Sequence, residues 1–246
     1  LGVLSHNINQ MSQQLKTTIQ QLNDEIEYVK KLEGMRKEFI ANFTHEIKTP
    51  LSIINGYIEL IEAGKDDLKK QQYLSAIHQE IEHINQLIMA MLDLSRLESG
   101  KVELHKEDID LEDLLMSIVE NFAPVLKKKH IHVVMGDEFP NIQGDFKELK
   151  IVFQNFMSNA IKHTPQDGHI YLDYVNGILK FENEGHHLRD EQIDKIWDTY
   201  VSGDRHGTGL GLAICRAILD LHGFSYCVIN SEKGVQFQIH IKDNEI

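Results

Sequence analysis

The chain is organised around FIANFTHEIKTPL, from Phe39 to Leu51. Within and beyond it, apolar residues recur in steps of three and four, the spacing of a helix packed in a bundle. They are Phe43, Ile47, Pro50, Ile54, Tyr57 and Ile61. His45 falls on the side away from this seam. The pattern therefore predicts a bundle helix that holds an imidazole out into water.

The residues around His45 add to this prediction. Glu46 stands beside it, and Thr49 lies four residues on, hence on the same helix face. Pro50 has no N–H to donate to the carbonyl of Glu46, and its ring crowds that carbonyl, so we expect a bend just beyond His45. Taken alone, such a stretch is more often a solvated helix face with a proline kink.

The composition is that of an ordinary soluble globular protein, with 41% hydrophobic and 26% charged residues among 246. The formal net charge of −13 argues against broad binding to nucleic acid or to an anionic membrane, because both require positive potential. Cys215 and Cys227 lack metal-ligand spacing and fit a reducing compartment without disulfides. The sequence has no signal peptide and no apolar run near the roughly 18 residues of a membrane span.

Residues 1–38 are expected to form a helix that runs into the His45 helix as a parallel coiled-coil dimer. Its seam consists of Leu4, Ile8, Met11, Leu15, Ile19, Leu22, Ile26 and Val29. Two successive steps of four, from Met11 to Leu15 to Ile19, resemble a stutter that locally unwinds a coiled coil. A plain dimerisation stalk is the simpler interpretation, and a tuned signalling element is the alternative.

Residues 39–99 are predicted to form a helical hairpin. The first helix should end near Glu62, with Gly64 as a stop signal and Asp66 or Asp67 as the next N-cap. The second helix, with Ile77, Ile81, Ile84, Ile88 and Met91 as its seam, should end near Ser99 and Gly100. One hairpin cannot bury both seams, whereas two copies can form a four-helix bundle.

Residues 100–246 mix strands and helices without strict alternation, which predicts an α/β sandwich rather than a parallel doubly wound sheet. The protein as a whole is thus expected to be multidomain, α and α+β, with a boundary at 99–101. Strands are expected at 102–104, 131–135, 170–175, 178–181, 226–229 and 235–241, and helices at 111–128, 146–161, 191–197 and 210–221. Asp110 and Asp113 should cap the first of these helices, and Asn176 with Gly177 predicts a hairpin turn.

Polar residues on one face of the helix at 146–161 indicate a nucleotide site. Asn155, Asn159 and Lys162 follow in steps of four and three, although Asn is a poor residue for a helix interior. Carboxamide oxygens can coordinate a hard cation whose charge is balanced by phosphates. A lysine one turn further on could neutralise phosphate oxygens. A solvated helix face is the weaker interpretation.

The stretch GTGLGLAI is a stronger signal for phosphate binding. Gly207, Gly209 and Gly211 leave backbone N–H groups uncovered, and the helix that begins near Leu210 directs its positive end at whatever they hold. A glycine-rich turn before a helix is the plain alternative. The position of the stretch, beyond the asparagines and after a lid-like loop, favours phosphate binding.

Together these motifs resemble those of bacterial sensor histidine kinases, in the same order and over nearly the whole chain. HEIKTPL resembles the H-box, which implies His45 as the phospho-acceptor, Glu46 as the adjacent acid and Thr49 as a residue of phosphatase action. The opening LGVLSHNINQMSQQL resembles the end of a HAMP linker. This implies that the chain is the cytoplasmic portion of a membrane sensor whose transmembrane part lies upstream.

FQNFMSNAIKHTP resembles the N-box of the Bergerat ATP-binding fold, and GTGLGLAI resembles its G2-box. The resemblance implies ATP and Mg²⁺ as cofactors, with Asn159 as the principal Mg²⁺ ligand and Asn155 as a helper. It also implies nucleotide contacts from Lys162, His163, Gly207, Thr208, Gly209, Leu210 and Gly211.

Two segments depart from the family pattern. NEGHH, from Asn183, stands where D-x-G-x-G is usual: Asn183 can still accept from the adenine amino group and Gly185 is retained, but His187 replaces the second glycine. Asn at this position also occurs in some typical members, including sensors of the vancomycin-resistance type. In the lid segment IWDTYVSGDRHGTG, Tyr200 replaces the usual Phe and Arg205 is the remaining phosphate-contact candidate. We therefore expect modest ATP affinity.

The resemblance predicts a homodimeric protein-histidine kinase that phosphorylates His45 with ATP and passes the phosphoryl group to an Asp of a response-regulator receiver domain. It also predicts phosphatase activity toward that regulator. One alternative is a non-catalytic dimeric signalling scaffold with a degenerate nucleotide site. A second is a Bergerat-fold ATPase that moves rather than phosphorylates.

Overall fold

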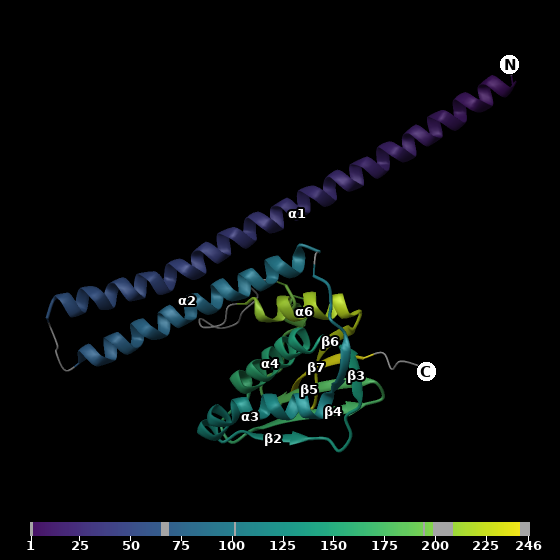
Figure 1. Cartoon of the computed structure of the whole chain (residues 1–246). Coiled ribbons are helices and arrows are strands. Elements are labelled where there is room, and N and C mark those ends of the chain that lie inside the picture. The colour runs from purple at the N-terminus through teal and green to yellow at the C-terminus, as the bar shows by residue number, and fades with distance from the viewer. Residues whose placement is uncertain (1, 65–68, 101, 194, 199–208, 242–246) are drawn as a thin grey trace. The chain divides into compact units, whose positions relative to one another are not determined.

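The structure is a computed structural model that describes residues 2–64, 69–100, 102–193, 195–198 and 209–241 (Figure 1). Its packing divides the chain into two compact units between Ile81 and Glu82, and each unit is described by itself. The domain limits expected from the sequence, 1–38, 39–99 and 100–246, stay predictions. None of the helices in the described residues is both long enough and apolar enough to span a membrane.

Two long helices dominate the first half of the chain. Helix α1 spans Gly2–Glu62 and is helical through Pro50, and α2 spans Lys70–Glu98. Both predicted helix ends are confirmed, and Gly64 adopts the left-handed φ of 62° expected of a stop signal. The cap candidates Asp66 and Asp67 lie outside the described residues. The rings of Tyr57 and Tyr73 stack at 5.5 Å, joining the two helices.

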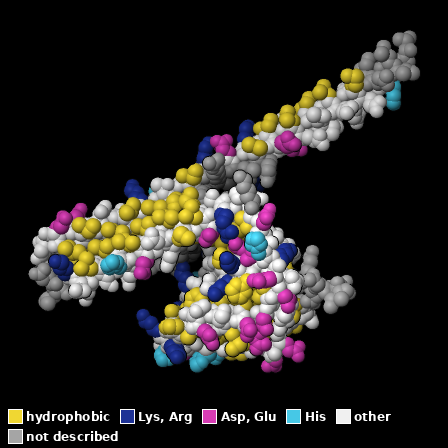
Figure 2. Space-filling view, viewed as in Figure 1, with side chains coloured by type: hydrophobic (Ala, Val, Ile, Leu, Met, Phe, Trp, Pro, Cys, Tyr) yellow, Lys and Arg dark blue, Asp and Glu magenta, His cyan; other side chains and the backbone are white. Residues whose placement is uncertain are grey.

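The apolar seam of α1 is exposed from Met11 to Val29 in the single chain. Met11 is 71% exposed, Leu15 62% and Val29 60%. Figure 2 shows hydrophobic side chains in a row along this helix. A contiguous exposed apolar row of this kind marks a surface that a partner covers. The exposure fits the predicted coiled-coil dimer, which remains a prediction.

The second unit is built on a mixed five-stranded sheet in the order β2-β4-β5-β7-β6. Its strands are β2 His132–Met135, β4 His169–Val175, β5 Ile178–Glu184, β6 Ser225–Asn230 and β7 Gly234–His240. Strand β2 runs parallel to β4, and the other pairs are antiparallel. Asn176 and Gly177 have φ of 52° and 77°, which confirms the predicted hairpin turn between β4 and β5.

Three helices cover one face of this sheet: α3 Leu111–Lys129, α4 Phe146–His163 and α6 Gly211–His222 (Figure 1). In α4, Phe153 stacks on Phe181 of β5 and Phe156 stacks on Phe237 of β7. Alternate residues of β4 and β5 are buried against this layer. The helices predicted at 111–128, 146–161 and 210–221 are confirmed, and so is the α/β sandwich. Asp110 caps α3 by accepting from the N–H of Asp113, as expected.

Two predictions along the chain need correction. Residues 102–106 do not form a strand; β1 spans Glu107–Asp110 and pairs with β3, Asn141–Gly144, in a separate ribbon. Gly144, opposite Glu107, ends the ladder, and the N–H of His105 donates to Asp145 instead. The helix expected at 191–197 is confirmed only at its start, because α5 spans Asp190–Ile193 and turns follow at 195–198.

Candidate functional site

His45 lies on α1 with an exposed side chain, as the sequence predicted. The hydroxyl of Thr49 donates to the carbonyl of His45 at 3.2 Å, so both residues share one helix face. Glu46 is half-buried and Pro50 is buried. Because the Thr49 hydroxyl donates its hydrogen to this carbonyl, its oxygen can still accept a hydrogen bond from another group.

The structure brings Asn155 of α4 against the start of α6. The amide nitrogen of Asn155 donates to the carbonyl of Ile151 at 2.9 Å, so Oδ1 points elsewhere. A Cβ atom added to Gly211 would lie only 2.6 Å from that Oδ1. A side chain at position 211 would collide with Asn155, so glycine is required there. The asparagine face of α4 and the glycine-rich stretch therefore lie next to each other.

The last turn of α4 meets the segment that follows β5. A Cβ atom added to Gly185 would lie 2.7 Å from the carbonyl oxygen of His163. Lys162 and His163 are exposed on this turn, and Asn159 is half-buried one turn earlier. The predicted contacts Asn155, Asn159, Lys162 and His163 thus lie along one helix, and Gly185 lies against its last turn.

Asn183 is 3% exposed, and its side-chain nitrogen donates to the carbonyl of Glu184 at 3.0 Å. This bond fixes the amide orientation, because the opposite orientation would set oxygen against oxygen. Oδ1 is then the hydrogen-bond acceptor of this amide. An acceptor suits an amino group such as that of adenine.

His187 stands where the family's second glycine is usual, and its ring forms a hydrogen bond with Ser231. Its Nε2 lies 2.8 Å from the carbonyl oxygen of Ser231 and donates to it. Asn230 holds the same loop, since its amide accepts from the N–H of Leu188 and donates to the carbonyl of Leu188, both at 2.8 Å. Sequence reasoning missed Asn230, because a lone Asn at a strand end carries no distinguishing pattern.

The glycine-rich stretch is described only from Gly209. Gly209 has a left-handed φ of 61°, and the buried Leu210 is the N-cap of α6. A leucine offers no side-chain oxygen to the first N–H groups of α6, and such uncapped N–H groups are where helices bind anions. Other predicted nucleotide contacts lie outside the described residues. They are Tyr200, Arg205, Gly207 and Thr208.

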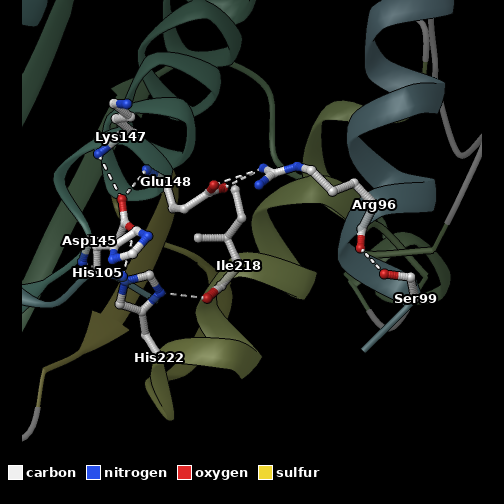
Figure 3. A network of polar contacts seen from close by, with 8 residues as sticks. All are labelled: Arg96, Ser99, His105, Asp145, Lys147, Glu148, Ile218 and His222. Atoms are coloured by element: carbon white, nitrogen blue, oxygen red, sulfur yellow. Dashed lines mark hydrogen bonds and ion pairs between the residues drawn. The ribbon is translucent and has the colours of Figure 1, made fainter. Parts of the chain in front are cut away.

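A polar network fixes the beginning of α4 (Figure 3). Asp145 caps the helix and accepts from the N–H groups of Lys147, Glu148 and His105. Burial raises the pKa of Asp145, but these donors, led by His105, outweigh it and leave the pKa below its ordinary value. The N-terminal end of the asparagine helix is therefore held by a carboxylate that stays ionised.

His222 of α6 completes the network. Its Nε2 accepts from the N–H of Asp145 at 3.0 Å, and its Nδ1 donates to the carbonyl of Ile218 at 2.8 Å. Burial lowers the pKa of His222, which keeps the ring neutral and able to accept. The start of α4 and the end of α6 are thus joined by a hydrogen bond.

Comparison with known proteins gives two family matches. Residues 35–100 match the His Kinase A (phospho-acceptor) domain, and residues 144–245 match the Histidine kinase-, DNA gyrase B-, and HSP90-like ATPase. The heme sensor protein HssS of Staphylococcus saprophyticus is 29% identical over 222 residues, which cover 87% of this chain and 48% of HssS. The sensor histidine kinase YclK of Bacillus subtilis is 29% identical over 255 residues, covering 98% of this chain and 52% of YclK.

Solved structures with a similar fold include two histidine kinases in complexes. Full-length ShkA in complex with AMPPNP is 27% identical, with a TM-score of 0.61 over 81% of this chain and 44% of ShkA. Histidine kinase ThkA in complex with the response regulator TrrA is 26% identical, with a TM-score of 0.68 over 83% of this chain and 60% of ThkA. The chain spans about half the length of the curated relatives HssS and YclK.

Proposed function

Since this chain belongs to the sensor histidine kinases of bacterial two-component systems, we propose that it phosphorylates itself on His45 with ATP and then phosphorylates a response regulator. The observation that supports the proposal is the approach of the Asn155 oxygen to Gly211, which brings a candidate cation ligand to the N-terminus of α6, the proposed phosphate site. Phosphoryl transfer requires mostly positioning and charge neutralisation, which Mg²⁺, Lys162 and the glycine-rich stretch would supply.

ATP would lie along α4. Asn183 would accept from the adenine amino group near Gly185, and the phosphates would lie at the N-terminus of α6. The residues present fit a magnesium ion, because Asn155 keeps its oxygen free of its own helix; Asn159, with Asn155 as helper, would hold it. Mg²⁺, when bound, neutralises charge on the phosphate oxygens. Lys162 would add a second positive charge.

In the proposed reaction one nitrogen of His45 attacks the γ-phosphorus in line, the N–P bond forms and the bond to ADP breaks. Glu46 accepts or orients the proton on the other ring nitrogen. The phosphoryl group then passes from His45 to an aspartate carboxylate on the receiver domain. The exposure of His45 supports both steps, because two different reactants must reach the same imidazole.

We assign Thr49 a role in dephosphorylating the response regulator. With its proton donated to the carbonyl of His45, its oxygen can accept a hydrogen bond from a water molecule. That water would be oriented toward the acyl phosphate of a regulator docked on the His45 face. The exposed row on α1 supports a homodimer. A cytoplasmic location with a membrane anchor elsewhere in the protein is part of the same proposal.

Calorimetric titration with ATP, with and without Mg²⁺, separates this function from a scaffold. The kinase proposal predicts saturable binding that Mg²⁺ strengthens, and Asn159→Ala should remove the Mg²⁺ effect. No binding at millimolar ATP by the folded chain would favour the scaffold. Phosphate release without labelled protein would favour the ATPase alternative.

A further inference from the structure

Lys129, the last residue of α3, reaches the C-terminal end of α4. Its Nζ donates to the carbonyl of Ile161 at 2.7 Å and lies 3.4 Å from the carbonyl oxygen of Lys162. Lys127 and Lys128 in the same turn are exposed, whereas Lys129 is half-buried. One of three consecutive lysines therefore directs its charge at the helix that carries the proposed nucleotide contacts.

The end of a helix needs such partners. Its last carbonyls have no N–H within the helix and carry a partial negative charge. Thr164 satisfies the carbonyl of Ala160 with its N–H and its hydroxyl, at 2.9 and 2.6 Å. Lys129 satisfies the next carbonyls. Its own carbonyl accepts from the N–H of Asp167 at 3.2 Å, which ties the turn after α4 to α3.

The turn held in this way belongs to the proposed nucleotide site. It carries Lys162, which the proposed function sets beside the phosphates, and His163, whose carbonyl lies against Gly185. The C-terminus of a helix is an unfavourable neighbour for an anion, and a cation placed there offsets the unfavourable charge. ATP is strongly anionic, so the charge on Lys129 bears on its binding.

We propose that Lys129 is a positioning residue of the nucleotide site, whose charge offsets the negative end of α4 and so favours ATP over an uncharged nucleoside. The inference rests on the proposed ATP binding. Lys129 acts through α4 and has no contact with the reacting groups in this account.

The test is calorimetric titration of the intact chain with Mg·ATP and, separately, with adenosine. Lys129→Met should weaken ATP binding about three- to tenfold, within the range of a partly buried helix-end charge effect, and change adenosine binding less than about twofold. Lys129→Arg should restore ATP binding. Lys128→Met, the matched exposed lysine, should bind both ligands as the unmodified chain does.

Equal losses for ATP and adenosine in Lys129→Met, or no loss at all, would overturn the inference. So would loss of ATP binding in Lys128→Met to the same extent, since a general charge effect would then suffice. Circular dichroism establishes that each variant is folded. Failure of the unmodified chain to bind ATP would instead overturn the proposed function, and the inference with it.

Discussion

Arg96 and Glu148 form an ion pair in which one guanidinium nitrogen contacts both carboxylate oxygens, at 2.7 and 3.0 Å (Figure 3). Asp145 and Glu148 have the spacing of a capping box, in which the Glu would accept from the N–H of the cap residue. His222 takes that N–H instead. Glu148 is thereby left to bind Arg96 at the end of α2.

Removing Arg96 should destabilise the second unit. In Arg96→Met the buried carboxylate of Glu148 loses its partner, and we expect a loss of about 1–2 kcal/mol in the free energy of unfolding, less than for a fully buried pair because water reaches Arg96. Urea unfolding of the intact chain measures it. Arg216→Met, which removes exposed pairs with Asp198 and Asp220, should cost less than about 0.5 kcal/mol.

The double variant Arg96→Met/Glu148→Met should recover most of the loss, because it removes the unpaired charge as well. A double variant no more stable than Arg96→Met would show that Arg96 contributes by packing and not by pairing.

The neutral state of His222 predicts a pH dependence of stability. Burial lowers the pKa of His222 from its ordinary 6.5, so protonation costs more in the folded chain than in the unfolded one. This contribution is fully present above about pH 6.5 and falls as the pH drops below it. Urea unfolding between pH 7.5 and 5.5 should show the decline, and it should be weaker in His222→Gln. Identical slopes for the two chains would contradict the assignment.

Gly211→Ala tests the contact on which the site depends. The new Cβ would lie 2.6 Å from Oδ1 of Asn155, so the variant should lose about 1–3 kcal/mol of stability and most of its ATP binding. Adding Asn155→Ala should restore the stability but not the nucleotide binding. Gly56→Ala, where a Cβ meets nothing within 4 Å, is the control and should leave ATP binding unchanged. Wild-type ATP affinity in Gly211→Ala would exclude this site.

Thr49→Ala should lower dephosphorylation of the regulator by at least about tenfold while autophosphorylation persists, because only the first process uses an oriented water. Thr44→Ala is the matched control, since the Thr44 hydroxyl also donates to the carbonyl four residues back, that of Ile40, at 2.8 Å. Decay of the labelled regulator measures both. Equal effects of the two substitutions would show that Thr49 acts only through its hydrogen bond to the helix backbone, and that it does not orient a water.

Most of the fold could be predicted from the spacing of apolar residues along the sequence. The steps of three and four through Phe43 and Ile47 predicted a continuous helix, and the N-cap pattern at Asp110 located the start of α3. Strand β3 was missed because Ile142 is its only large apolar residue, too little for an alternation pattern. Val102 and Leu104 alternate like a strand, but no partner strand extends to them.

The candidate site was predictable only as separate motifs. Spacing along one helix placed Asn155, but its approach to Gly211 is a contact between helices that no local pattern contains. Lys129 and Asn230 act through backbone carbonyls and N–H groups of distant segments. Such contacts depend on tertiary packing, so one lysine in a run of three could not be singled out beforehand.

Phosphorylation of His45 is tested by incubating the intact chain with γ-labelled ATP and Mg²⁺ beside the variant His45→Gln. Phosphorylation of His45 predicts label on the unmodified chain that is labile in acid, stable in base and absent from His45→Gln. Label of equal amount on the variant, or no label on a folded and ATP-binding chain, would contradict it.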